Sequence, residues 1–405
     1  MVQPITILLL AALAGVLLIL IVVVAVAQSL HKTPAPAAAA KAPHAPANAH
    51  GAKPRVVRNA AKAAAGTKQA EQRDAATRKG QEAAGVFAVI ASIGAVVGGL
   101  AFVIDFLKGD FEPQVSELAA GALHGTMING RNSDPVVLIV PGSGPTDRDG
   151  NNPMGLKTDT YKLLAEGLID KRVASVRIDK RGMFASTGAG DPNAVTPAVY
   201  AADIHAWIDA IKAERGPGSG CVFLLGHSEG ALMVTLAAQG RKDVCGLILV
   251  AGMGRPMGEV IREQLKANPA NAPILDEALA ALRELEAGRR VDTATMTPAL
   301  LPLFNPAAQG YLISVINVDP VEALRRAGKE TLIIQGDRDL QVSVDDARKL
   351  DAVRNTELRI IGGMNHVLKD APEDRAGNLA TYADAGLPLS KDVVRRIRSF
   401  VKDND

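Results

Sequence analysis

Residues 221–230, Cys-Val-Phe-Leu-Leu-Gly-His-Ser-Glu-Gly, constrain the fold more than any other stretch of this chain. An apolar run of strand length ends at Gly226, and residues 231–238 continue with helical character. In such a G-x-S-x-G arrangement the serine lies on a turn so tight that the residues two before and two after it must lack a bulky side chain. We expect this turn to lift the Ser228 hydroxyl out of a sheet, which makes Ser228 the candidate nucleophile. The alternative is a glycine-flanked turn in which the serine is incidental.

Alternating strands and helices are predicted from residue 113 to the C-terminus. Short apolar runs, typical of strands that are buried on both faces, occur at residues 136–140, 173–178, 221–225, 247–250, 331–334 and 357–361. Amphipathic stretches between them predict helices at residues 161–168, 199–213, 231–239 and 344–350. This alternation predicts an α/β domain with a mostly parallel sheet and helices on both faces. Residues 115–128 are expected to form an antiparallel hairpin ahead of it.

The N-terminal third differs in composition from the rest of the chain. Residues 5–27 form an uncharged apolar run of 23 residues, long enough to cross a hydrocarbon layer of ~30 Å as a helix. We therefore expect a transmembrane helix or signal anchor over residues 1–27. A cleaved secretory signal is the alternative, because Ala25-Val-Ala27 resembles a small-residue cleavage site.

A basic linker and a second apolar run follow. Residues 28–84 are rich in Ala, Pro and Lys, with ten Lys and Arg against three acids, so we expect a linker that is attracted to membrane lipid. The alternative is a solvated spacer without a partner. Residues 85–108 predict a second transmembrane helix, with Gly94 and Gly98 on one face. Basic loops tend to stay in the cytoplasm, so the domain that follows is expected on the non-cytoplasmic side.

Composition excludes several classes of function. The net charge of +2 and an aromatic content of 3% argue against a nucleic-acid partner. The two cysteines, Cys221 and Cys245, form no metal-ligand cluster, and we expect neither a metal nor a cofactor. Both cysteines lie in apolar runs and are expected to be unpaired core residues; a disulfide between adjacent strands is the minor alternative.

An acid and a base are predicted at the ends of later strands. Asp339 follows the run at residues 331–334 and fits a Gly-x-x-Asp-x-x-Val pattern, whereas Asp337 is expected only to stabilise the turn. His366 lies on a glycine-containing loop after residues 357–361. Of the other histidines in this part of the chain, His124 and His205 are expected to be structural, and His227 belongs to the G-x-S-x-G turn. Ser228, Asp339 and His366 thus occur in the order Ser, Asp, His that is typical of one catalytic triad.

Backbone N–H groups are the expected donors to a substrate oxyanion. One should come from Glu229, the residue after the candidate nucleophile, and the other from Ser143. Ser143 lies in Pro141-Gly-Ser-Gly-Pro145, here called the glycine loop, which lacks the Gly-Lys-Ser/Thr ending of a phosphate loop. The other residues expected to contact substrate are Gly142, Gly144 and His227.

Five motifs carry a resemblance to a known family. They are Val140-Pro-Gly-Ser-Gly-Pro-Thr-Asp-Arg-Asp-Gly-Asn151, Arg177-Ile-Asp-Lys-Arg-Gly182, Gly226-His-Ser-Glu-Gly230, Gln335-Gly-Asp-Arg-Asp339 and Gly363-Met-Asn-His366. Together they resemble the α/β-hydrolase superfamily, and within it the EstD-like carboxylesterases of the serine-aminopeptidase-like group. The resemblance covers residue 115 to the C-terminus. It implies Ser228, Asp339 and His366 as the triad and an esterase activity on short acyl chains. Met-Phe-Ala at residues 183–185 departs from the smaller turn that is usual in the family.

These features predict a membrane-anchored serine hydrolase, a carboxylesterase acting on small to medium acyl esters through an acyl-enzyme. A peptidase, thioesterase or acyltransferase with the same triad is the second hypothesis, and a catalytically silent binding or membrane-organising protein is the third. Residues 252–326 are expected to form a helical cap over the pocket. Arg148, Asp179, Lys180 and Arg181 are expected to form structural ion pairs, with recognition of an acidic substrate as the alternative. The sequence leaves the oligomeric state open.

Overall fold

The computed structural model describes residues 66–81, 83–87, 90–91, 94, 99 and 112–405. Two compact units are present, Met1–Asp110 and Phe111–Asp405. In the first unit the described residues are helical, including 66–81 and 83–87. The predicted first transmembrane helix and most of the second lie outside the described residues. Among the residues that are described, no helix is both long and apolar enough to cross a membrane.

An eight-stranded sheet forms the centre of the second unit, in the order β1-β2-β4-β3-β5-β6-β7-β8. The strands are β1 (Gln114–Ala120), β2 (Leu123–Asn129), β3 (Val136–Val140), β4 (Ala174–Ile178), β5 (Val222–His227), β6 (Val244–Val250), β7 (Thr331–Gly336) and β8 (Thr356–Ile361). The β1–β2 and β2–β4 pairs are antiparallel and all other pairs are parallel. The predicted parallel sheet and its antiparallel lead-in hairpin are therefore confirmed.

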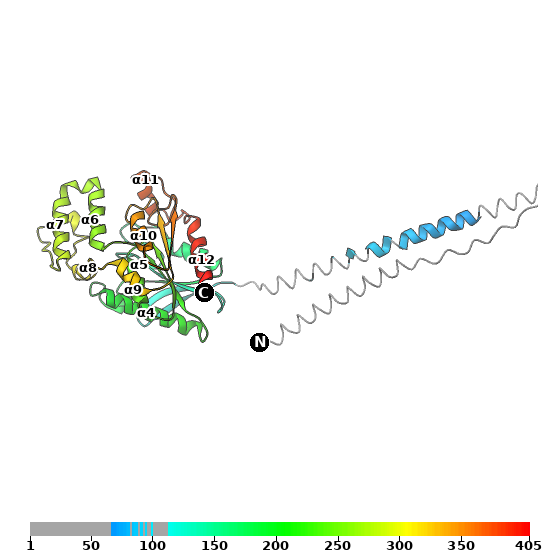
Figure 1. Ribbon diagram of the computed structural model, residues 1–405, viewed down its shortest axis with the longest axis horizontal. Coiled ribbons are helices and arrows are strands. Elements are labelled where there is room, and N and C mark those ends of the chain that lie inside the picture. Colours follow the sequence, from blue (N-terminus) through cyan, green and yellow to red (C-terminus); the bar gives the residue numbers. More distant parts are fainter. Residues whose placement is uncertain (1–65, 82, 88–89, 92–93, 95–98, 100–111) are drawn as a thin grey trace, which may run out of the picture. The chain divides into compact units, whose positions relative to one another are not determined.

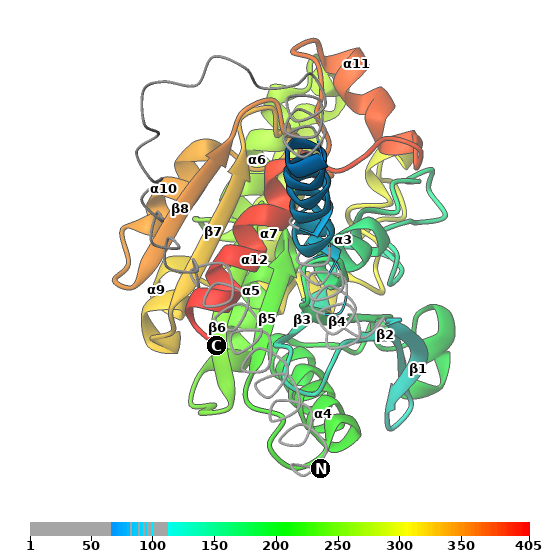
Figure 2. The same ribbon diagram turned by 90° about the vertical axis from the view of Figure 1, so that its right-hand side faces the viewer.

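Helices cover both faces of this sheet. On one face lie α3 (Thr160–Ile169) and α12 (Asp392–Asp403), which are in front of the strands in Figure 2. On the other lie α4 (Pro197–Arg215), α5 (Glu229–Ala238), α9 (Pro320–Ala327) and α10 (Val344–Asp351). Alternate residues of β3 serve the two faces: Val137 and Ile139 pack toward α3, and Leu138 packs toward α4 and α5. Because each face needs apolar side chains, the central strands are continuously apolar.

The last strand is less buried than predicted. We expected residues 357–361 to be covered on both faces, but in β8 only Ile361 is buried and Ile360 is 42% exposed. The reason is its position, since β8 pairs only with β7 and forms an edge of the sheet (Figure 2). An apolar run in sequence does not distinguish an edge strand from a central one.

The prediction of two unpaired cysteines is wrong. Cys221 and Cys245 form a disulfide, with their Cα atoms 5.3 Å apart. Val222 of β5 pairs with Val244 of β6, and a register shift follows before Leu224 pairs with Leu247. Because Cys245 directly follows Val244, it lies beside the start of β5. The bond closes the β5–α5–β6 unit at the end of β5 that lies opposite Ser228.

A helical insertion lies between β6 and β7. Its main helices are α6 (Met257–Ala267), α7 (Leu275–Glu286) and α8 (Gln309–Val315). These helices share an apolar cluster of their own, which includes Ala278, Leu282 and Phe304. Figure 1 shows α6 and α7 set apart from the strands of the sheet. Helix α11 (Arg375–Ala380) follows the loop that carries His366.

Candidate active site

Ser228 lies on a strained turn between the end of β5 and the start of α5. Its backbone has φ 55° and ψ −121°, a combination that a residue with a side chain rarely adopts. A Cβ on Gly226 would lie 2.2 Å from the Gly230 carbonyl oxygen, and one on Gly230 would lie 2.5 Å from the Val140 carbonyl oxygen. Both flanking positions therefore require glycine, as the sequence pattern predicted. The Ser228 N–H donates to the Val250 carbonyl oxygen at 2.9 Å, which anchors the turn to β6.

Asp339 and His366 are brought together from the loops after β7 and β8. The His366 Nδ1 atom lies 2.8 Å from Asp339 Oδ2, and both side chains are buried. Burial raises the pKa of Asp339, but the electrostatic interaction and hydrogen bond with His366 and the N–H groups of Gln341 and Val342 outweigh it, so the pKa lies below its usual value. Asp337 instead accepts the Gly363 N–H at 2.7 Å, which is a turn-stabilising role.

His366 lies next to the serine turn. Its ring centroid is 4.8 Å from that of His227, the residue that precedes Ser228. Within residues 112–405, no hydrogen bond joins the Ser228 hydroxyl to His366. Hydrogen bonds between a nucleophile and its base often tighten only when substrate is bound.

The glycine loop presents a free N–H beside the serine. Among the described residues, neither the Ser143 N–H nor the Glu229 N–H has a hydrogen-bond acceptor, and both residues line one cavity with Ser228. The loop is held by Lys180, whose Nζ donates to the Gly142 carbonyl oxygen at 2.6 Å and also to that of Gly144. Burial lowers the pKa of Lys180 to about 8. The lysine therefore binds the carbonyl oxygens of the loop and leaves the Ser143 N–H available.

A buried network of hydrogen bonds supports this arrangement. The Gly142 N–H donates to Tyr161 Oη at 3.2 Å, and Tyr161 Oη lies 2.8 Å from His227 Nδ1. His227 Nε2 lies 2.8 Å from the His366 carbonyl oxygen, which can only accept, so the proton of His227 is on Nε2. Tyr161 then donates to Nδ1. Burial lowers the pKa of His227 to about 3, and the electrostatic interaction with His366 acts in the same direction.

This network changes the expected role of two residues. His227 and Gly142 are not among the residues that line the cavity, whereas Gly144 is. Both ring nitrogens of His227 bond to protein atoms, so this histidine connects the glycine loop to the loop of His366. Tyr161, the residue in the middle of the network, had no sequence signal beyond its place in a predicted helix.

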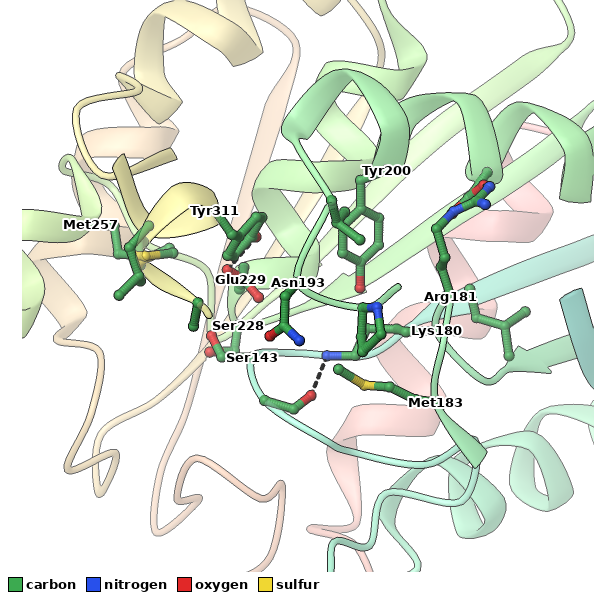
Figure 3. Close-up of a pocket in the computed structure, with 18 of the residues that line it drawn as sticks. Ser143, Lys180, Arg181, Met183, Asn193, Tyr200, Ser228, Glu229, Met257 and Tyr311 are labelled. Atoms are coloured by element: carbon green, nitrogen blue, oxygen red, sulfur yellow. Dashed lines mark hydrogen bonds and ion pairs between the residues drawn. The ribbon is translucent and has the colours of Figure 1, made fainter. Parts of the chain in front are cut away.

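The cavity beside Ser228 has a volume of about 400 Å³ and is lined by both the sheet and the insertion. Apolar walls come from the insertion and from the core of the domain: Leu123, Ile178, Met253, Met257, Val260 and Leu312. Polar groups are interspersed among them: Lys180, Asn193, Tyr200, Glu229 and Tyr311 (Figure 3). Met183, from the motif that departs from the family pattern, also contributes to the wall.

The charged residues near the strand ends form ion pairs. Arg148 lies 2.8 Å from Asp179 and also contacts Glu117, and Arg181 Nε lies 2.9 Å from Asp203 Oδ2. These pairs match the predicted structural role. Lys180 is the exception, because its hydrogen-bond partners are the backbone carbonyl oxygens of the glycine loop.

Comparison with known proteins identifies the family. Residues 136–378 match the alpha/beta hydrolase family. The chain belongs to the α/β-hydrolases. This α/β-hydrolase is 29% identical over 254 residues to esterase EstD of Thermotoga maritima, an alignment that covers 60% of this chain and 57% of that protein. The chain thus spans little more than half of the length of that relative.

Solved structures similar to this α/β-hydrolase include esterases. Est1E from Butyrivibrio proteoclasticus is 16% identical with a TM-score of 0.45, covering 72% of this chain and 98% of Est1E. The esterase Pf2001 of Pyrococcus furiosus is 17% identical with a TM-score of 0.45, covering 73% of this chain and 91% of Pf2001. The family match over residues 136–378 establishes the α/β-hydrolase family.

Proposed function

We propose that this esterase-like α/β-hydrolase is a serine carboxylesterase that cleaves small to medium acyl esters through an acyl-enzyme. The observation that carries the proposal is the buried 2.8 Å contact of Asp339 with His366, beside a serine on a strained turn. Three chain segments converge on this point, and the glycine loop adds a free N–H. A lone serine on a tight turn would not account for this convergence.

The proposed reaction begins when Ser228 Oγ attacks the ester carbonyl. His366 takes the serine proton at Nε2, while Asp339 holds Nδ1–H and stabilises the imidazolium that forms. The N–H groups of Ser143 and Glu229 donate to the oxyanion. His366 then returns the proton to the alcohol oxygen as the ester bond breaks. Water, activated by the same histidine, releases the acid from Ser228.

A fluorophosphonate probe tests whether the serine is activated. We expect the wild-type protein to be labelled and the Ser228→Ala variant to remain unlabelled. Labelling that persists in Ser228→Ala would place the reactive residue elsewhere. Absence of labelling in the folded wild-type protein would favour a catalytically silent protein.

Substrate comparison separates the carboxylesterase from a peptidase, thioesterase or acyltransferase. We expect p-nitrophenyl acyl esters to be hydrolysed with a higher kcat/KM than aminoacyl p-nitroanilides or acyl thioesters of the same acyl group. A preference for the amide or thioester, or transfer of the acyl group to an added alcohol in place of water, would contradict the proposal.

We further propose that N-terminal helices over residues 1–27 and 85–108 anchor the domain to a membrane, with the catalytic domain on the non-cytoplasmic side. Two observations support this. The loop between the two apolar runs is basic, and the domain contains the Cys221–Cys245 disulfide, which is rare in reducing compartments. Protease protection in sealed spheroplasts or cells tests the orientation: the catalytic domain should be digested from outside. Protection of the domain until the membrane is permeabilised would reverse the orientation.

A further inference from the structure

The cavity contains polar groups that the proposed mechanism does not use. Tyr200, on α4, is only 9% exposed, and its hydroxyl oxygen is buried without a hydrogen-bond partner among the described residues. Figure 3 shows its hydroxyl directed toward the part of the cavity near Lys180 and Asn193. A buried hydroxyl without a partner costs about 1–3 kcal/mol. Trp207, which also lines the cavity from α4, likewise has an indole N–H without a partner in the described part of the chain.

Glu229 adds an acceptor to the same cavity. Its side chain is buried, and Oε1 accepts a hydrogen bond from Tyr311 of α8 at 2.5 Å. Within residues 112–405 the second carboxylate oxygen has no hydrogen-bond partner. The Glu229 backbone N–H is the proposed donor to the oxyanion. The free oxygen of its carboxylate is therefore available to accept a hydrogen bond from another group.

The charges around the cavity are balanced. Lys180 offsets Glu229, and Arg181 is paired with Asp203. A substrate group with a net charge would meet a nearby charge of the same sign as well as one of the opposite sign. A neutral group that both donates and accepts hydrogen bonds fits these surroundings better, because it can accept from Tyr200 and donate to Glu229.

The cavity receives the acyl side of the ester. In the proposed mechanism the leaving alcohol takes its proton from His366, so the alcohol must lie on the side of that histidine. The cavity is lined by Ser228, Ser143 and Glu229 but not by His366. The acyl chain therefore extends from the serine into the cavity, between apolar walls.

We propose that the preferred substrates are esters whose acyl group carries a hydroxyl, held by Tyr200 and the Glu229 carboxylate. This inference rests on the proposed esterase function and specifies its substrate class. The apolar walls bind the carbon chain, and the hydroxyl satisfies polar groups that are otherwise unpaired. A site built to bind a hydroxyl discriminates strongly against the analogue that lacks it, because the buried polar groups are then left unsatisfied.

The test uses three sets of p-nitrophenyl esters of one acyl length with the full-length protein in detergent. One set carries a hydroxyl at successive chain positions, the second carries methoxy groups at the same positions, and the third is unsubstituted. We expect at least one hydroxyacyl ester to exceed the unsubstituted ester roughly 10-fold or more in kcat/KM. The matching methoxyacyl ester, which cannot donate to Glu229, should lose this advantage.

Two variants and one control test whether Tyr200 and Glu229 cause the preference for the hydroxyacyl ester. In Tyr200→Phe and in Glu229→Gln, the ratio of kcat/KM for the hydroxyacyl and unsubstituted esters should fall several-fold. Ile208→Val, in the core on the same helix as Tyr200 and away from the cavity wall, controls for general loosening and should retain the wild-type ratio.

The outcomes separate this inference from the proposed function. Hydrolysis of unsubstituted esters with no preference for any hydroxyacyl ester, or a preference that both variants keep, would overturn the hydroxyacyl assignment while leaving the esterase intact; the polar groups would then be satisfied by water. Failure to hydrolyse any ester, together with no fluorophosphonate labelling, would instead overturn the proposed function.

Discussion

Acid should destabilise this protein through His227 in particular. The pKa of His227 is lowered by burial from 6.5 to about 3, so the folded state keeps the imidazole neutral while the unfolded chain binds a proton below pH 6.5. The stability that this histidine contributes is complete above pH 6.5 and is lost as the pH falls toward 3. Each pH unit between these two pKa values lowers the free energy of unfolding by about 1.36 kcal/mol. Between pH 7.5 and 4.5 the loss is about 3 kcal/mol, because only the part of this range below the unfolded pKa of 6.5 contributes. The loss is the same for any folded pKa below about 4.

Replacement by glutamine, His227→Gln, removes the titrating group while retaining a donor and an acceptor. Urea unfolding of both proteins at pH 7.5 and 4.5 gives the free energies of unfolding. We expect the wild type to be the more stable protein at pH 7.5, and its advantage to shrink by about 3 kcal/mol at pH 4.5. Other titrating groups are common to both proteins and cancel in this comparison.

A second variant separates burial from hydrogen bonding. Tyr161→Phe removes the donor to His227 Nδ1 but leaves the histidine buried, and burial is the main cause of its low pKa. This variant should be less stable at both pH values and keep the wild-type dependence on pH. If the difference between wild type and His227→Gln is the same at pH 7.5 and 4.5, the reasoning from burial is refuted.

Three further predictions concern the frame of the site. Because the Cys221–Cys245 bond closes a loop with a sequence separation of 24, its replacement by two serines should lower the free energy of unfolding by about 3 kcal/mol in urea titrations, a loss that a reducing agent should reproduce in the wild type. Lys180→Met should lower kcat on p-nitrophenyl esters by roughly 10- to 100-fold, with a smaller change in KM, because the glycine loop loses its anchor; an unchanged kcat would show that the loop holds its position without the lysine. Gly226→Ala should lower the thermal midpoint or prevent folding, since its Cβ would meet backbone atoms at 2.2 Å, while Gly188→Ala, which has open space, should not.

The central strands and the loops of the candidate triad were predictable because each is marked by a pattern within a few consecutive residues. The apolar run at residues 136–140 coincides with β3, and the glycines at 226 and 230 mark a turn that no larger residue tolerates. Asp339 could be chosen over Asp337 from its spacing after a glycine, and the structure gives Asp339 the contact with His366.

Contacts that depend on register or on packing between distant segments were not predictable. The disulfide forms because β5 and β6 are neighbours and their pairing places Cys245 beside the start of β5, whereas the sequence offered this arrangement only as the minor alternative. The role of His227 depends on Tyr161, which approaches it only after α3 has packed on the sheet. The exposure of β8 likewise depends on its place at the edge, which is set by the topology of the whole sheet.

The hydrogen bond between Tyr311 and Glu229 joins the insertion to the catalytic machinery. Tyr311 belongs to α8, and Glu229 supplies one of the proposed oxyanion donors from its backbone. Outward movement of the insertion, which would widen the way in for a bulky ester, must first separate these two side chains. This single hydrogen bond therefore links the position of α8 to the side chain of the residue that directly follows Ser228.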